Sequence, residues 1–197
     1  MRLLNVSTLQ FREFFDKDVP AYAILSHRWS EDEVTYKDFV RGGRTDSAGH
    51  RKVLECCELV RSRRVVMYSD GADRSEDELL QWVWIDTICI DKRSSAELSE
   101  AINSMFAWYR NAEECIVYLP DVALAKGTDE KLCSISNTLE AASLFRSSEW
   151  WQRGWTLQEL LAPPRAVFFT AGWDVIGHKC PKVSPNLCNH HSSPSYG

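Results

Sequence analysis

The sequence lacks the long apolar runs and the basic clusters that mark membrane proteins and nucleic-acid-binding proteins. No stretch approaches the roughly 18 apolar residues that a spanning helix needs, and the first residues show no continuous apolar segment of the kind found in a signal peptide. Lysine and arginine total 23 against 28 aspartate and glutamate, which gives a net charge of −5. A mildly acidic chain without a basic cluster is not expected to bind nucleic acid or an anionic membrane surface. We therefore expect no membrane span and no nucleic-acid partner.

Two glycine-rich signatures of nucleotide binding are also missing. Neither the G-x-x-x-x-G-K-[ST] pattern of ATPases nor the G-x-G-x-x-G pattern of dinucleotide-binding folds occurs. The cysteines and histidines near the end of the chain, at 180, 188, 190 and 191, lack the paired spacing of a zinc site, so we predict no metal.

The seven cysteines do not suggest a disulfide framework. Their number is odd, Cys56 and Cys57 are adjacent in an amphipathic stretch, and Cys89 and Cys115 lie inside apolar runs. Buried free thiols are typical of a reducing compartment, so the predicted location is cytoplasmic.

The 197 residues, of which 44% are hydrophobic, suit one α/β domain. Apolar runs that predict buried strands alternate with segments of helical periodicity, and such alternation favours a mostly parallel sheet flanked by helices. The strands are expected at 21–25, 82–86, 115–119 and 166–170, and the helices at 49–63, 98–109, near 137–145 and within 150–161. Ser94 and Glu97 have the spacing of a capping box at the start of the second helix. The polar stretch 69–77 is expected to be an exposed loop.

The chain divides by composition into three parts. Residues 1–19 form a lead-in, residues 20–179 the expected domain, and residues 180–197 a tail rich in Pro, Ser, Asn and His. The tail has no periodicity and few apolar groups to offset the entropy of ordering, so we predict that it is disordered or foreign to the domain.

Four long motifs in register resemble one family, the heterokaryon-incompatibility (HET) domain of filamentous fungi. They are Tyr22–Trp29 (YAILSHRW), Trp84–Lys92 (WIDTICIDK), Glu97–Tyr109 (ELSEAINSMFAWY) and Arg153–Pro163 (RGWTLQELLAP). The resemblance implies a role in fungal nonself recognition and programmed cell death, with self-association or other incompatibility proteins as partners. Members of the family usually continue beyond residues 173–179 into further helical sequence, so it also implies a C-terminally shortened domain.

HET domains in turn resemble TIR domains, which have a flavodoxin-like sheet. On this sequence Trp155–Leu160 (WTLQEL) resembles the TIR segment whose glutamate is catalytic in the TIR enzymes that cleave NAD. The resemblance implies that Glu159 is a catalytic residue and that NAD is a substrate rather than a cofactor.

The chemistry of that reaction is compatible with a single carboxylate. Cleavage between ribose and nicotinamide develops oxocarbenium-like positive charge on the ribose, and the leaving group is already cationic and needs no general acid. A carboxylate near the ribose, here Glu159, can bind its hydroxyls and stabilise that charge. The alternative interpretation is that Glu159 is a surface residue or a first-turn helix residue favoured by the helix dipole.

Ligands of open parallel sheets bind beyond the carboxyl ends of the strands. Ser26, His27, Arg28 and Trp29 follow the first predicted strand, and Asp86 ends the second. We therefore predict these residues as substrate-binding candidates. For His27 a local hydrogen bond that holds the loop is an equal alternative. Asp86 and Asp91 could together hold a divalent cation. For Asp86 a structural role, in which it braces neighbouring backbone or forms a salt bridge to Arg28 or Lys92, is favoured.

Two further candidates precede Glu159. Arg153, like Arg28, can pair with a diphosphate through bidentate contacts. Trp155, like Trp29, can stack on a base, although large aromatics are more often part of the core.

Two different kinds of function remain open at this point. One is an NAD-cleaving or related nucleotide-cleaving enzyme, and the other is a non-enzymatic interaction or self-assembly module in cell-death signalling. Both would share the fold, so the fold does not decide between them. A third reading, in which Cys89 and His27 form a thiol nucleophile pair, is disfavoured because a thiol in an apolar run usually packs in the core.

Overall fold

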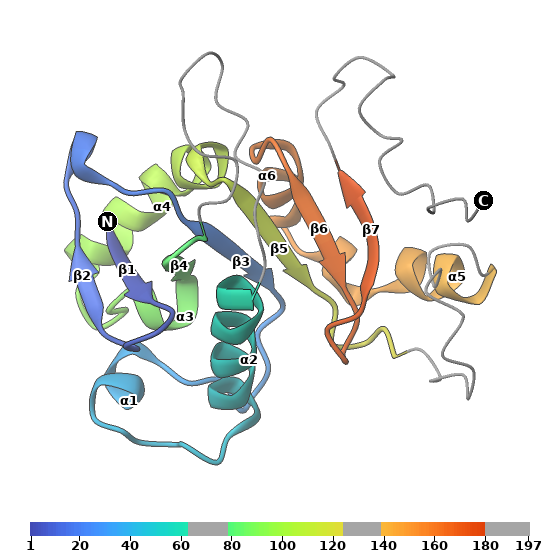
Figure 1. Cartoon of the computed structure of the whole chain (residues 1–197), viewed down its shortest axis with the longest axis horizontal. Coiled ribbons are helices and arrows are strands. Elements are labelled where there is room, and N and C mark those ends of the chain that lie inside the picture. The colour runs from blue at the N-terminus through green and yellow to red at the C-terminus, as the bar shows by residue number, and fades with distance from the viewer. Residues whose placement is uncertain (63–78, 124–138, 180–197) are drawn as a thin grey trace, which may run out of the picture.

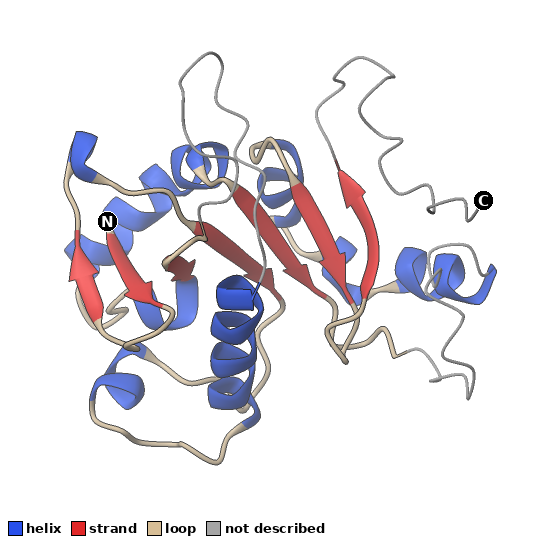
Figure 2. Ribbon diagram, viewed as in Figure 1, coloured by secondary structure: helices blue, strands red, loops and turns tan. Residues whose placement is uncertain are grey.

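The computed structural model describes residues 1–62, 79–123 and 139–179. The loop expected at 69–77, part of the stretch before the predicted helix at 137–145, and the tail from residue 180 with its cysteines and histidines lie outside the described residues. In the described part of the chain, one sheet lies between helices (Figures 1 and 2).

The sheet has seven strands in the order β2-β1-β4-β3-β5-β6-β7. Their bounds are β1 Arg2–Asn5, β2 Phe11–Glu13, β3 Ala23–His27, β4 Trp82–Ile85, β5 Glu114–Tyr118, β6 Ala166–Phe169 and β7 Val175–Lys179. The four central strands β4-β3-β5-β6 are parallel, whereas the pairs at both edges are antiparallel. Taken in chain order, the parallel strands are arranged second-first-third-fourth, which is the order of flavodoxin-like sheets. The predicted α/β fold is confirmed, with antiparallel edges that the strand pattern did not reveal.

The helices arise from the expected periodicity. They are α1 Tyr36–Val40, α2 Ala48–Ser62, α3 Asp86–Cys89, α4 Ser95–Asn111, α5 Leu139–Ser147 and α6 Thr156–Leu161, with short 3-10 turns η1 Asp16–Asp18 and η3 Glu149–Gln152. Helix α2 lies in front of the sheet in Figure 1, and α4 and α6 lie behind it. The apolar face of α2 is buried against the core, as its spacing predicts. No helix in the described residues is both long and apolar enough to traverse a bilayer.

The first nineteen residues contribute a hairpin to the sheet. Strand β1 pairs with β2 on one side and with β4 on the other, where Leu4 lies opposite Val83. Leu3 and Leu4 are both completely buried, so both faces of β1 are covered. Strands of four and three residues are too short to show a periodicity, and the sequence analysis assigned no element here.

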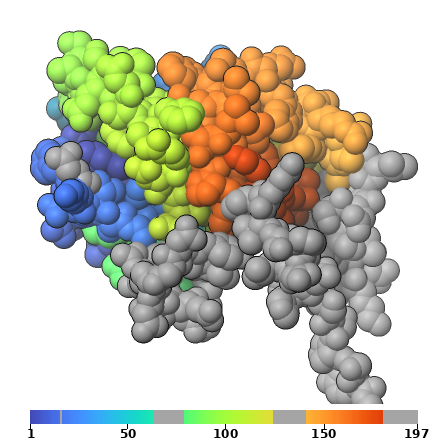
Figure 3. Space-filling model, turned by 90° about the horizontal axis from the view of Figure 1, so that it is seen from above, coloured from blue at the N-terminus to red at the C-terminus, as the bar shows by residue number. Residues whose placement is uncertain are grey.

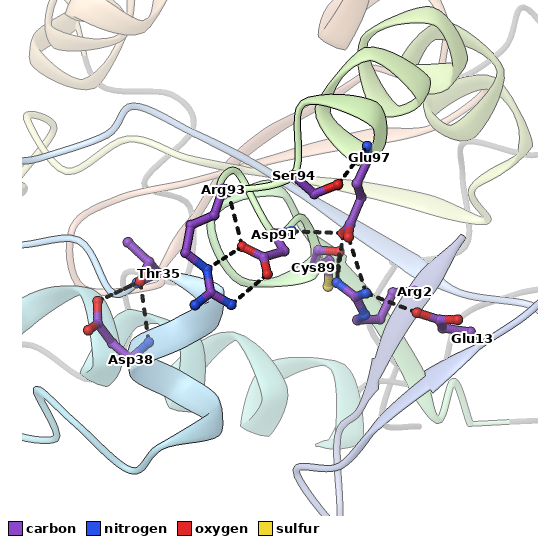
Figure 4. Close-up of polar contacts among 9 residues, drawn as sticks. All are labelled: Arg2, Glu13, Thr35, Asp38, Cys89, Asp91, Arg93, Ser94 and Glu97. Carbon is purple, nitrogen blue, oxygen red and sulfur yellow. Dashed lines mark hydrogen bonds and ion pairs between the residues drawn. The ribbon is translucent and has the colours of Figure 1, made fainter.

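Arg2 fastens this hairpin to the start of α4 (Figure 4). Its guanidinium donates to the carboxylates of Glu13 and Glu97, at 2.9 and 2.7 Å. Ser94 accepts a hydrogen bond from the backbone N–H of Glu97, which is half of the predicted capping box. The Glu97 carboxylate, however, accepts from Arg2 and from the Asp91 N–H rather than from the cap residue. A partly buried arginine from the N-terminal hairpin binds this carboxylate instead. A pattern of neighbouring residues cannot predict a partner so distant in the sequence.

Candidate functional site

A cavity of about 510 Å³ opens at the carboxyl ends of β3 and β4. It lies where the chain changes direction across the sheet, because β4 and β5 flank β3 on opposite sides. Ligands of doubly wound sheets bind at this kind of position. In Figure 3 the green surface of α4 meets the orange surface that contains α6, and these two helices contact each other. The lining residues are Arg28, Trp29, Asp86, Ile90, Lys92, Leu98, Ile102, Met105, Arg153, Gly154, Trp155 and Glu159.

The ends of the two strands differ from the predicted ones. Strand β3 runs to His27, so Ser26 and His27 belong to the strand and only Arg28 and Trp29 follow it. Strand β4 ends at Ile85, and Asp86 is the first residue of the single helical turn α3. Strand β3 is longer than predicted because Ser26 and His27, which are polar but buried, continue the pairing with β5. The prediction of its end relied on apolar residues alone.

Glu159 lies inside this site. It is 2% exposed, although it belongs to the first turn of α6. Arg153 binds its carboxylate through two N–H donors, at 3.0 Å to Oε2 and 3.1 Å to Oε1, and the Ser26 hydroxyl donates to Oε2 at 2.6 Å. Each carboxylate oxygen can accept about two hydrogen bonds. Oε1 therefore keeps acceptor capacity for a ligand, whereas Oε2 is fully occupied.

A break in the predicted helix makes this arrangement possible. The helix expected within 150–161 is divided into η3 and α6, with extended backbone at Arg153 between them. Gly154 follows directly, and glycine is a poor helix former. The break lets Arg153 fold back onto Glu159.

Ser26 connects Glu159 to the core. It accepts a hydrogen bond of 2.8 Å from Trp150 Nε1 while it donates to Glu159. Trp150 is 1% exposed and packs edge-on against Trp151 and Phe168. The buried indole therefore helps to orient the Glu159 carboxylate through Ser26.

A second polar group lies at the mouth of the cavity. Trp29 Nε1 donates to Asp86 Oδ2 at 2.7 Å, and the Lys92 ammonium lies 3.3 Å from the centre of the Trp29 ring. Burial raises the pKa of Asp86, although the Lys92 charge and the Trp29 hydrogen bond act against it. The predicted salt bridge from Asp86 is replaced by the indole contact, and Arg28 instead pairs with Glu149.

His27 lies beneath this group and does not line the cavity. Its side chain is fully buried, with Nδ1 3.8 Å from Asp86 Oδ1 and Nε2 3.9 Å from Glu33 Oε2. Neither ring nitrogen has a hydrogen-bond partner among the described residues. Burial lowers the pKa of His27 well below 6.5, and the charges of Lys52, Arg153 and Lys92 lower it further. The imidazole is therefore neutral at pH 7.

The structure thus brings the predicted residues together in one place. Six of them line the cavity. Ser26 donates a hydrogen bond to Glu159, and His27 lies near Asp86 without a hydrogen bond to it. Both arginines already have carboxylate partners, so neither is free for a diphosphate without exchanging that partner.

Sequence reasoning missed three contributions to the site. The first is Lys92, a cation in the cavity lining that contacts the ring of Trp29 among the described residues. The second is Trp150, a buried residue that donates a hydrogen bond to Ser26. The third is an apolar wall that α4 contributes through Leu98, Ile102 and Met105. In the sequence these residues look like an ordinary core-facing side of a helix. The repeated Trp150-Trp151 next to the RGWTLQE motif is the one signal that pointed to a structured region there.

Cys89 does not face His27 as a nucleophile pair would require. Its sulfur accepts a hydrogen bond from the Ile85 N–H at 3.3 Å, beneath the turn of α3. Burial raises the pKa of this thiol to about 12, so it is protonated and unreactive at pH 7.

Comparisons with known proteins identify relatives of the chain. The family model described as heterokaryon incompatibility protein (HET) matches residues 22–138. The vegetative incompatibility protein HET-E-1 of Podospora anserina is 42% identical over 154 residues, which cover 77% of this chain and 10% of that protein. The chain thus spans about a tenth of the length of this relative. No solved structure matches the chain.

Proposed function

The chain belongs to the heterokaryon incompatibility (HET) family, and from that premise we propose that it acts in nonself recognition leading to cell death by cleaving NAD or a related nucleotide. The observation that carries the enzymatic part is the position of Glu159. It is a buried acidic residue on the wall of a 510 Å³ cavity, at the strand ends where α/β sheets bind ligands. The cavity volume lies within the range of about 300–1,000 Å³ that is usual for small-molecule sites.

The proposed cleavage of NAD needs mainly a fixed carboxylate beside the ribose. The bond between ribose C1′ and the nicotinamide nitrogen breaks, its electron pair goes to the cationic ring, and a water oxygen bonds to C1′ and loses a proton. Positive charge develops on the ribose before water adds. Glu159 is fixed by Ser26 and Arg153, so its charge faces the reacting sugar without first reorganising. Its free acceptor capacity at Oε1 suits a ribose hydroxyl.

The direct test is nicotinamide release from NAD by the purified protein. We expect Glu159→Gln to lower the rate by at least about a hundredfold, because the substitution removes the stabilising charge. Glu159→Asp keeps the charge and the partner of Arg153, and it should fold while reacting more slowly. Glu58→Gln, which changes an exposed glutamate on α2, is the matched control and should leave the rate unchanged. A folded Glu159→Gln protein with the wild-type rate would exclude this role.

One observation favours the second candidate, a non-enzymatic module that signals by self-assembly. Leu157 and Leu161 lie four residues apart on α6 and are 65% and 60% exposed. An isologous interface uses the same surface on both subunits, so the partner that we propose for this apolar surface is a second copy of the chain. Light scattering of a Leu157→Glu/Leu161→Glu variant tests this candidate. A loss of assembly and of cell killing, with nicotinamide release unchanged, would favour the module over the enzyme.

A further inference from the structure

We propose that the apolar wall of the cavity is the subsite for an aromatic ring, so that the ligand is a nucleotide whose base lies against α4. The inference rests on the proposed function for the position of the sugar, but it concerns binding rather than cleavage. Neither the family match nor the relative assigns a role to this wall.

The wall is a continuous apolar surface from two elements. Leu98, Ile102 and Met105 project from one side of α4 at helical spacing, and Ile90 adds to them from the segment after α3. Ile90 and Met105 are almost completely buried, whereas Ile102 is 44% exposed. A ligand in the cavity would cover the exposed part of Ile102, and removing this apolar surface from water favours binding.

The cavity also has polar lining residues. They are Glu159 with Arg153, and Asp86 with the nearby Lys92. A ligand that contacts both the apolar wall and these residues must therefore have an apolar part and a polar part. A nucleotide has this division, because the faces of its base are apolar and its sugar and phosphate are polar.

The tryptophans favour a flat ring over an alkyl chain as the apolar end. Trp29 and Trp155 both line the cavity and are 50% and 44% exposed. Exposed indoles stack on planar rings, and this stacking adds to the gain from the apolar area that they bury. Lys92 covers one face of the Trp29 ring. Among the described contacts no cation covers the Trp155 ring, so Trp155 is the better candidate for stacking on a base.

Calorimetry with matched probes tests ring binding at the subsite, and of these probes AMP and ribose 5-phosphate contain no nicotinamide bond to cleave. AMP and ribose 5-phosphate differ only in the adenine ring, and nicotinamide mononucleotide carries the alternative ring. We expect at least one ring-bearing probe to bind about tenfold or more tightly than ribose 5-phosphate. Ile102→Glu should abolish most of that preference, because the ring would then bury a charge. Ile102→Gln removes the apolar contact without adding charge and provides a second variant if the first does not fold.

Phe106→Glu is the matched control. Phe106 lies four residues after Ile102 on α4 and is exposed to a similar extent, at 49%, but it does not line the cavity. Its variant should keep the preference for a ring. Three results would overturn the subsite. They are equal binding of ribose 5-phosphate and both ring-bearing probes, tighter binding of hexanoate, an alkyl-chain probe, than of the ring-bearing probes, and an unchanged ring preference in folded Ile102 variants. A preserved ring preference without nicotinamide release from NAD would instead reject the proposed reaction and leave the subsite standing.

Discussion

Ser26 is the residue on which the geometry of the site depends most. It is 1% exposed and links the buried indole of Trp150 to the carboxylate of Glu159. We expect Ser26→Ala to destabilise the protein by about 1–3 kcal/mol, because the Trp150 N–H would remain buried without an acceptor. Urea unfolding measures the change, and Ser99→Ala on the exposed side of α4 is the control. An unchanged unfolding midpoint would mean that water or another acceptor replaces the hydroxyl.

His27 should make stability depend on pH. Its folded pKa lies well below 6.5, so in acid the unfolded chain binds a proton that the folded protein excludes. Stability contributed by this residue is therefore complete above pH 6.5 and decreases as the pH falls below it, by up to about 1.4 kcal/mol per pH unit. The neighbouring Asp86 has the opposite effect, because its raised pKa favours the protonated folded state, but only in the range above its ordinary value of 3.8.

The His27 contribution can be separated by comparison with His27→Gln. Urea unfolding of both proteins between pH 5 and 7.5 should give a smaller slope for the variant, since Glu33, Lys52, Lys92, Arg153 and Asp86 are present in both. Parallel curves for the two proteins would show that the imidazole accepts a proton in the folded state.

At the scale of elements, α2 approaches the loop before α1 so closely that only glycine fits at the contact. A Cβ at Gly49 would lie 2.6 Å from the Asp32 carbonyl oxygen and 2.7 Å from Glu33 Cα. Both neighbours are backbone atoms, so they cannot rotate away. We expect Gly49→Ala to cost about 1–3 kcal/mol in unfolding free energy and to displace Glu33 from His27. Gly43→Ala is the control, since its Cβ would meet nothing closer than 3.6 Å. Equal stability of the two variants would contradict the close contact.

The elements show what a sequence can reveal about this fold. The helices α2 and α4 and the four parallel strands were predicted because each carries a long apolar pattern of its own. The N-terminal hairpin was missed because its strands are short and are stabilised by pairing with β4, a partner distant in sequence. The break before α6 was missed because Arg153 forms an ion pair with Glu159, six residues later, which the apolar pattern does not reveal.

The same reasoning explains the outcome for the candidate site. Residues next to strand ends could be predicted, because parallel strands bring their carboxyl ends to one edge. The ion pair between Arg153 and Glu159, the lysine over Trp29 and the apolar wall could not, since each depends on how separate elements pack.

At the scale of the whole molecule, the lead-in is expected to be essential for folding. Leu3 and Leu4 are fully buried, and β1 covers an edge of β4 that would otherwise be unpaired. We therefore expect a chain that begins at residue 20 to lose its cooperative thermal transition and to aggregate. A chain that begins at residue 20 and melts at the wild-type temperature would show that residues 20–179 are sufficient.

The pairing of β1 with β4 also has a consequence for biosynthesis. Leu4 leaves the ribosome almost eighty residues before Val83, which lies opposite it in the ladder. Until then the nascent N-terminal hairpin has no place in the sheet, and its two leucines stay accessible to chaperones. The hairpin can thus join the sheet only after β4 has been translated.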